Sequence, residues 1–216
     1  MISTGIVACS NAQKIESREQ NNSLVDFLKS TGRAVFLSEC IYEKNSIFSG
    51  SAKQKADELM KLFNNPEVSE IYDISGGDMA NEILDYLDYD AIKKSQAVYW
   101  GYSDLTTVIN AIYTMTGKSS VLYQIRNLCH TDFKVVQRER FIQIDDLFNP
   151  KFELIRGDKI KGTVVGGNIR CLLKLAGTRY FPDFRDKVIL LESFHGRAEQ
   201  NNFISKIGKI SCSSKL

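Results

Sequence analysis

Apolar and polar residues follow two different periods along the first 125 residues of the chain. Short apolar runs, which are typical of buried strands, recur at 5–9, 34–37, 71–74, 97–100 and 121–123. Between these runs, apolar residues repeat every three or four positions, as they do on the buried face of a helix. The alternation predicts an α/β fold in which helices cover both faces of a parallel sheet.

The clearest predicted helix spans residues 52–63. Ser51 and Gln54 occupy the two positions of a capping box at its start, and Asn64-Asn65-Pro66 follows its last turn. One face of this helix is apolar and carries Ala52, Ala56, Leu59, Met60 and Phe63.

Three further helices are expected in the same part of the chain. Ser23 with Asp26 is typical of a helix start, and Gly32 of the end of that helix. A second helix runs up to Leu84, and a third covers 105–113 and ends before Gly117.

The pattern loosens after residue 123. Residues 124–157 mix charged and aromatic residues without a clear period, and we interpret them as a crossover between domains. Regular alternation then returns with a strand and glycine turn at 162–168, a helix at 169–175, a strand at 188–192 and a helix around 197–207. We therefore expect an N-terminal α/β domain at 1–125, a linker at 126–160 and a partial, smaller α/β domain at 161–216.

The composition is that of an ordinary globular protein. Of 216 residues, 43% are hydrophobic and 25% are charged, which argues against disorder. No apolar run approaches about 18 residues and the start lacks a signal peptide, so we predict a cytoplasmic protein without membrane contact. The net charge is +2, and basic residues are scattered singly through the second half, which argues against nucleic-acid binding.

The five cysteines are odd in number and contain no C-x-x-C pair. This spacing indicates reduced thiols, and we expect neither a metal site nor a cofactor.

Candidate chemistry lies where predicted strands pass into helices, because sites in parallel sheets form at the carboxyl ends of strands. At Gly76-Gly77 the missing side chains would let a ligand approach backbone N–H groups, next to the positive end of the following helix. Met79 or Ala80 would then occupy the elbow where an enzyme holds a nucleophile. The alternative is a tight turn with a structural role only.

Two more glycine turns repeat this geometry. In Gly101-Tyr102-Ser103-Asp104, Ser103 could be a nucleophile, but no second glycine follows it. We therefore favour a structural turn in which Ser103 or Asp104 caps the helix at Leu105. After Gly166-Gly167, Asn168 either binds a ligand or caps the next helix.

Taken together, these turns resemble the LD-carboxypeptidase family, which includes muramoyltetrapeptide carboxypeptidases and microcin-C self-immunity peptidases. The resemblance is carried, in order, by residues 76–81, 86–90, 101–106, 166–168, 176–178 and 190–192. It implies an N-terminal domain similar to class I amidotransferases and a smaller C-terminal domain that completes the site. It also implies metal-free hydrolysis by a Ser–Glu–His triad, a murein tetrapeptide or similar small peptide as substrate, and a possible homodimer.

The resemblance also implies which residues act in this chain. It assigns the orienting carboxylate to Glu192, the nucleophile position to Ala80, which has no hydroxyl, and the histidine to a segment well beyond Glu192. The chain has about 24 residues after Glu192, so we expect a C-terminally truncated chain with impaired catalysis. Substrate or oxyanion binding is expected at Gly76, Gly77, Asn81 and Asn168.

Two alternatives remain open. Ser75 or Ser103 could replace the missing nucleophile, with His195 or His130 as the base, which would make the chain an active hydrolase. The cleft could instead serve a non-catalytic module that binds a peptide or an adenylate.

Overall fold

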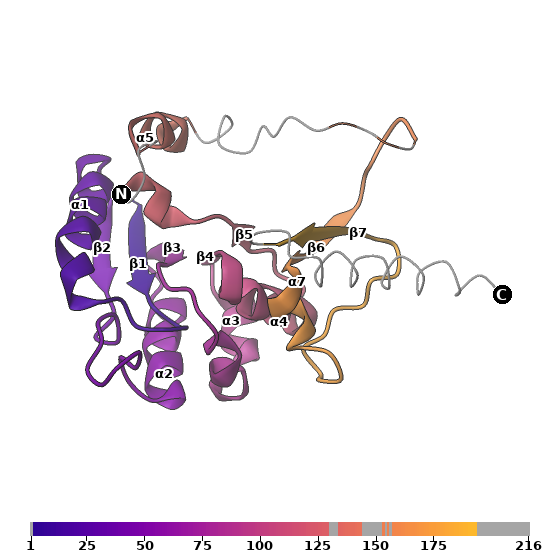
Figure 1. Ribbon diagram of the computed structural model, residues 1–216, viewed down its shortest axis with the longest axis horizontal. Helices are drawn as coiled ribbons and strands as arrows, with labels where there is room; N and C mark the ends of the chain where they lie inside the picture. The colour runs from indigo at the N-terminus through magenta and orange to yellow at the C-terminus, as the bar shows by residue number, and fades with distance from the viewer. Residues whose placement is uncertain (1, 130–133, 144–152, 154, 156, 194–216) are drawn as a thin grey trace.

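A computed structural model describes residues 2–129, 134–143, 153, 155 and 157–193. A five-stranded parallel sheet forms its centre, with the strand order β2-β1-β3-β4-β5 (Figure 1). The strands are β1 (Ser3–Val7), β2 (Ala34–Leu37), β3 (Val68–Asp73), β4 (Val98–Gly101) and β5 (Val121–Leu122). A second, two-stranded parallel sheet pairs β6 (Thr163–Asn168) with β7 (Lys187–Glu192). This architecture confirms the predicted α/β fold with a small second sheet.

Helices and short 3-10 helices connect the strands. The α-helices are α1 (Arg18–Ser30), α2 (Ala52–Phe63), α3 (Tyr89–Lys94), α4 (Thr106–Thr116), α5 (Lys134–Ile142) and α7 (Ile169–Leu173). The 3-10 helices are η1 (Ile15–Ser17), η2 (Ala80–Tyr86), η3 (Ser103–Leu105) and η4 (Ile125–Leu128).

The central sheet is buried on both faces. Neighbouring residues of β3 show this, because Ile71 packs in one apolar cluster and Tyr72 in the other, and both are 0% exposed. The cluster around Ile71 includes residues of α2, η2 and α4, whereas that around Tyr72 includes residues of α1, η4 and α5. Alternate side chains of a strand point to opposite faces, so the continuous apolar runs follow from this double burial.

The local signals of two helices are confirmed. The side chains of Ser51 and Gln54 form both hydrogen bonds of the capping box at the start of α2. Gly117 ends α4 with a φ of +75°, in the left-handed region that glycine adopts without a steric cost.

Two expectations about helices were wrong, and a third helix is present but is of the 3-10 type. α1 begins at Arg18, because its buried face extends back past Ser23 to Asn21. The residues leading to Leu84 form the 3-10 helix η2. α5 lies within the stretch interpreted as irregular crossover, and its Phe141 packs edge-on against Tyr72 of the central sheet. The helix expected around 197–207 lies outside the described residues.

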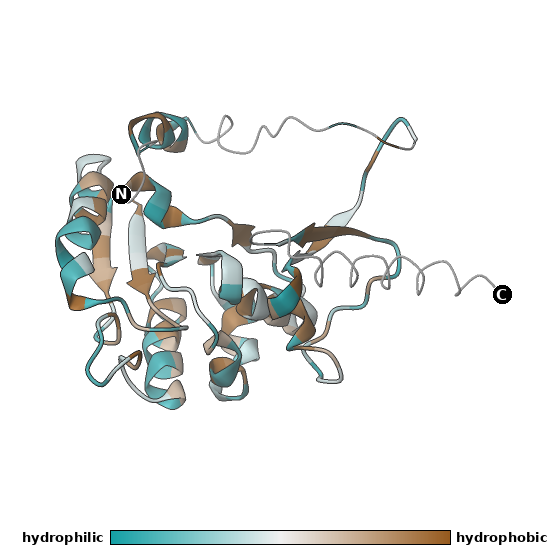
Figure 2. Cartoon of the chain, in the orientation of Figure 1, coloured by the Kyte–Doolittle hydropathy of each residue, from teal (hydrophilic) through white to brown (hydrophobic). Residues whose placement is uncertain are grey.

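The two sheets are joined by a buried amide on α4. The side chain of Asn110, 1% exposed, donates from Nδ2 to the Gly166 carbonyl at 2.8 Å and accepts from the Gly166 N–H at 2.9 Å. Asn110 therefore pairs with β6 as a neighbouring strand would. The apolar side chains of β7 give this strand its brown colour in Figure 2. None of the helices that the structure describes is long and apolar enough to cross a membrane.

Candidate active site

The turn after β4 holds a serine in an unusual backbone conformation. Ser103 has a φ of +57°, a left-handed conformation that costs a side-chain-bearing residue about 1–2 kcal/mol. It lies two residues after the end of β4 and is the first residue of η3, which α4 follows at Thr106. A Cβ on Gly101 would come within 2.8 Å of the Leu105 side chain, so the turn requires glycine at that point. A strand, a turn with a left-handed serine and a helix follow one another here, as they do in a nucleophile elbow, although this turn contains one glycine.

Ser103 and Asp104 do not cap the helix that follows. Neither η3 nor α4 has a side-chain hydrogen bond at its N-cap, so the capping prediction was wrong. Ser103 is half-buried, and its Oγ makes no hydrogen bond to any other residue in the described ranges. Within the described part of the chain, the hydroxyl is thus left unpaired at the carboxyl end of the sheet.

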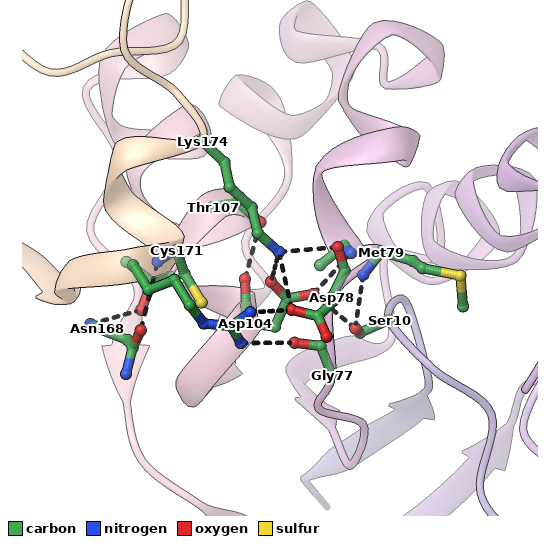
Figure 3. Close-up of polar contacts among 12 residues, drawn as sticks. Ser10, Gly77, Asp78, Met79, Asp104, Thr107, Asn168, Cys171 and Lys174 are labelled. Carbon is green, nitrogen blue, oxygen red and sulfur yellow. Dashed lines mark hydrogen bonds and ion pairs between the residues drawn. The ribbon is translucent and has the colours of Figure 1, made fainter. Parts of the chain in front are cut away.

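Asp104, the residue after Ser103, holds this turn in place through the hydrogen bonds of its carboxylate. Its carboxylate is fully buried and accepts hydrogen bonds from Ser10 Oγ at 2.6 Å, the Ala80 N–H at 2.8 Å and Lys174 Nζ at 2.6 Å (Figure 3). These donors follow β1, begin η2 and follow α7, respectively. One carboxylate therefore brings together three segments that are far apart in the sequence.

The Gly76-Gly77 turn comes just before Ala80, whose N–H donates to Asp104. Gly77 has a φ of +132°, and a Cβ there would overlap the Asn11 side chain. Asn11 also accepts the Asp78 N–H at Oδ1, at 3.2 Å. Gly76 pairs with Asn11 in an isolated antiparallel bridge. The Gly77 N–H donates to no described residue, so within the described part of the chain it is available to a ligand.

Two cations from the C-terminal half hold the same turn. Arg170 forms an ion pair with Asp78, and Lys174 donates to the Asp78 carbonyl at 2.8 Å (Figure 3). The neighbouring guanidinium lowers the pKa of Asp78. The turn is therefore pinned to α7 and the residue that follows it.

The structure gives Ala80 a different environment from the one expected of a nucleophile position. Its side chain is 0% exposed and lies in the apolar cluster that contains Leu105 and Val108. Ser75, an alternative nucleophile, is also 0% exposed, and its Oγ donates to Asp73 Oδ1 at 2.6 Å. Asn81 is half-buried and makes no side-chain hydrogen bond to another residue that the structure describes.

Asn168 and Glu192 come together at the ends of β6 and β7. They are register partners, and Asn168 Nδ2 donates to Glu192 Oε2 at 3.1 Å. Asn168 also caps α7 by accepting the Cys171 N–H, and its own N–H donates to Thr106 Oγ1 at 3.0 Å. The capping alternative is thus confirmed, while the amide nitrogen still faces the carboxylate.

Glu192 lies beside the elbow. Burial, and then the Glu192 carboxylate, raise the pKa of the Tyr102 hydroxyl, and Tyr102 immediately precedes Ser103. The Asn168 contact with Thr106 brings β6 to the first residue of α4, which follows the same elbow. The structure therefore gathers Ser103, Asn168 and Glu192 in one region, whereas the Ala80 side chain points into the core. His130 and His195 lie outside the described residues.

A buried polar network under the site was missed by the sequence analysis. Asp73, at the end of β3, accepts the Tyr99 hydroxyl at 2.8 Å and the Cys9 N–H at 3.0 Å, and burial raises its pKa. Lys55, 2% exposed, donates to the Ser10 carbonyl at 3.1 Å. The polar residues that follow or end adjacent apolar strands in the sequence could have predicted this network. Among the described residues, no group of three or more His, Cys, Asp or Glu side chains could hold a metal ion.

Known proteins resemble this chain along both halves. Residues 4–123 match the family model of the LD-carboxypeptidase N-terminal domain, and residues 161–205 match that of the C-terminal domain. The "Probable murein peptide carboxypeptidase" of Bacillus subtilis is 27% identical over 77% of this chain, and the microcin C7 self-immunity protein MccF of Escherichia coli is 22% identical over 86%. The chain spans 55% and 67% of their lengths, respectively.

Solved structures share the fold. MccF in complex with glutamyl sulfamoyl guanosine superimposes with a TM-score of 0.78 at 22% identity, covering 97% of this chain and 73% of that one. The muramoyltetrapeptide carboxypeptidase from Oxalobacter formigenes gives a TM-score of 0.70 at 20% identity, covering 92% and 68%.

Proposed function

Because this chain belongs to the LD-carboxypeptidase family, we propose that it is a serine hydrolase that removes the C-terminal residue of a short peptide, with Ser103 as the nucleophile. The observation that carries the proposal is the φ of +57° at Ser103. A serine held in a strained conformation between a strand and a helix, with a hydroxyl that no described residue engages, is suited to act as the nucleophile of acyl transfer.

The surrounding groups support the individual steps. The Ser103 hydroxyl would attack the carbonyl carbon of the scissile peptide bond and pass its proton to a base. The base would return this proton to the departing amino group as the C–N bond breaks, and water would then hydrolyse the acyl-enzyme. The Gly77 N–H, which donates to no described residue, is suited to the negative charge of the resulting oxyanion, or to the carboxylate of the substrate. Glu192, with one oxygen bonded to Asn168, is suited to orient the histidine that the family resemblance implies.

This proposal moves the nucleophile away from position 80. A hydroxyl at position 80 would lie in the apolar cluster and would need the core to open before it met a substrate. On this proposal the alanine there does not impair the enzyme. An active-site variant of MccF that has been solved replaces a serine, an asparagine and a lysine by alanine, which supports a serine and an asparagine such as Ser103 and Asn168 as working groups.

A murein tetrapeptide is the substrate class that we propose. One curated relative is named for murein peptides, and another solved relative is a muramoyltetrapeptide carboxypeptidase. MccF binds aspartyl sulfamoyl adenosine, in which an acidic aminoacyl group is joined to a nucleoside. An aminoacyl nucleotide is therefore the second substrate to try, and binding without turnover would favour the non-catalytic module.

Two substitutions test the position of the nucleophile. The purified chain should release D-Ala from a murein tetrapeptide and should be labelled by a serine-reactive phosphonate at Ser103. Ser103→Ala should lower kcat by about 10³-fold or more and abolish labelling, because the covalent step loses its oxygen. Ala80→Ser is the matched control and should leave both readouts unchanged.

The opposite pattern would overturn the proposal. If the wild-type chain were inert towards both reagents while Ala80→Ser released D-Ala, the nucleophile position would be residue 80 and the natural chain would be impaired. Full activity of Ser103→Ala would equally exclude Ser103.

A further inference from the structure

A cavity outside the proposed active site lies on the α1 side of the central sheet, at the carboxyl ends of β1, β2 and β3. Its volume is about 330 Å³, and no residue of the proposed active site lines it. Ile6, Ile41 and Ile74 form buried apolar walls, whereas Leu37 lines it with 55% of its surface exposed. The cavity is close to the lower limit of small-molecule sites, so one amino-acid-sized group would fill it.

A buried amide faces this cavity without a hydrogen-bond partner. Asn21 of α1 lines it and is 4% exposed, and neither its Oδ1 nor its Nδ2 has a partner among the described residues. Asn110 and Asn168, two other buried asparagines, both have their side chains hydrogen-bonded. Buried polar groups are almost always paired in folded proteins, so an exception that faces a cavity points to an absent ligand.

The position of Asn21 on its helix strengthens the argument. Asn21 lies three residues before Leu24 and seven before Leu28, both 0% exposed, so it occupies the apolar stripe of α1. A leucine there would extend the stripe and would avoid the cost of two unpaired polar atoms. Packing therefore gives no reason for an amide at this place.

A cation lies at the same cavity. Arg18 is three residues before Asn21 and lines the cavity, and its guanidinium lies 4.7 Å from the ring centroid of Tyr42. No carboxylate in the described ranges lies within ion-pair distance of Arg18. The ring orients a planar charge that is free to form a bidentate pair with an anion.

We propose that this cavity binds a small molecule that carries an amide, an apolar side chain and a carboxylate, which is the chemistry of an N-acylated amino acid or of the last residue of a short peptide. Asn21 Oδ1 accepts the amide N–H of the ligand, and Asn21 Nδ2 donates to its carbonyl. The carboxylate pairs with Arg18, and the side chain packs against Ile6, Ile41 and Ile74. The proposal does not depend on Ser103.

Binding of N-acetyl-L-leucine to the full chain tests this inference. We expect the ¹⁵N–¹H signals of the Asn21 side-chain amide to shift saturably as N-acetyl-L-leucine is added to millimolar concentration. The titration gives the affinity. N-acetyl-L-leucinamide, which lacks the carboxylate, should bind about tenfold more weakly. Arg18→Gln should remove this difference between the two probes, and since Arg18 is exposed, the variant should fold normally.

Asn21→Leu should raise the melting temperature and abolish binding of both probes, because it fills the apolar stripe and removes the amide. Gln20→Ala, an exposed change on the same helix, is the matched control and should bind like wild type. Ser103→Ala should also bind like wild type, which separates this site from the proposed active site. Retained binding in Asn21→Leu, or no saturable signal in the wild type because the cavity holds only water, would overturn the inference.

Discussion

Lys174→Met is the sharpest test of how the elbow is held in place. Lys174 Nζ lies 2.6 Å from Asp104 Oδ1, and the side chains are 21% and 0% exposed, respectively. Removing one partner of a buried pair costs about 3–5 kcal/mol when the other charge is left uncompensated. Here Ser10 Oγ and the Ala80 N–H remain as donors and Lys174 is partly solvated, so we expect about 2–3 kcal/mol.

The free energy of unfolding from urea titrations at pH 7 measures this loss, which corresponds to a fall in Tm of roughly 4–12 °C for a chain of this length. Arg185→Gln is the matched control. It breaks an ion pair with Asp183 whose side chains are 87% and 56% exposed, and exposed pairs contribute about 0–1 kcal/mol.

A double-mutant cycle completes the test. Lys174→Met should cost clearly less in an Asp104→Asn background, because the carboxylate that it leaves unpaired is already absent. A loss in Lys174→Met no larger than that in Arg185→Gln, or equal losses in both backgrounds, would refute the reasoning.

Three further outcomes are expected. Gly77→Ala should cost about 1–3 kcal/mol, since its φ is +132° and a Cβ would overlap Asn11, whereas Gly76→Ala, with no atom within 4 Å of its Cβ, should cost little; urea unfolding compares the two. Ser103→Gly should stabilise the fold by roughly 0.5–1 kcal/mol, because it relieves the left-handed strain, while abolishing D-Ala release. Burial raises the pKa of Asp73 above 3.8, so the folded state holds this proton to a higher pH than the unfolded chain does. The free energy of unfolding should therefore fall as pH rises above 3.8. Asp73→Asn should make that fall smaller, as measured by urea titrations at a series of pH values.

Local signals in the sequence were enough to predict some of these elements. The capping box at Ser51 and Gln54 and the glycine that ends α4 are formed by residues a few positions apart, so the sequence contains everything that stabilises them. α5 was missed because the residues that cover Phe141, among them Phe27, Tyr72 and Trp100, are far from it in the sequence.

The candidate site was only partly predictable for the same reason. The choice of the glycine turns as candidate sites followed from the rule that sites in parallel sheets form at the carboxyl ends of strands. The contact between Asn168 and Glu192 was not predicted. The role of Asp104 did not, since its partners Ser10, Ala80 and Lys174 lie 94, 24 and 70 residues away. The left-handed conformation of Ser103 was not predicted either.

The amide of Asn110 has a mechanical consequence for any reaction at this edge. The Asn110 side chain bonds both the N–H and the carbonyl of Gly166. It therefore attaches the small sheet to α4, which also packs against the large sheet. Glu192 belongs to β7 of the small sheet, and Ser103 follows β4 of the large one. Their relative geometry is thus built in during folding, and an arriving substrate does not have to spend its binding energy on drawing two halves together.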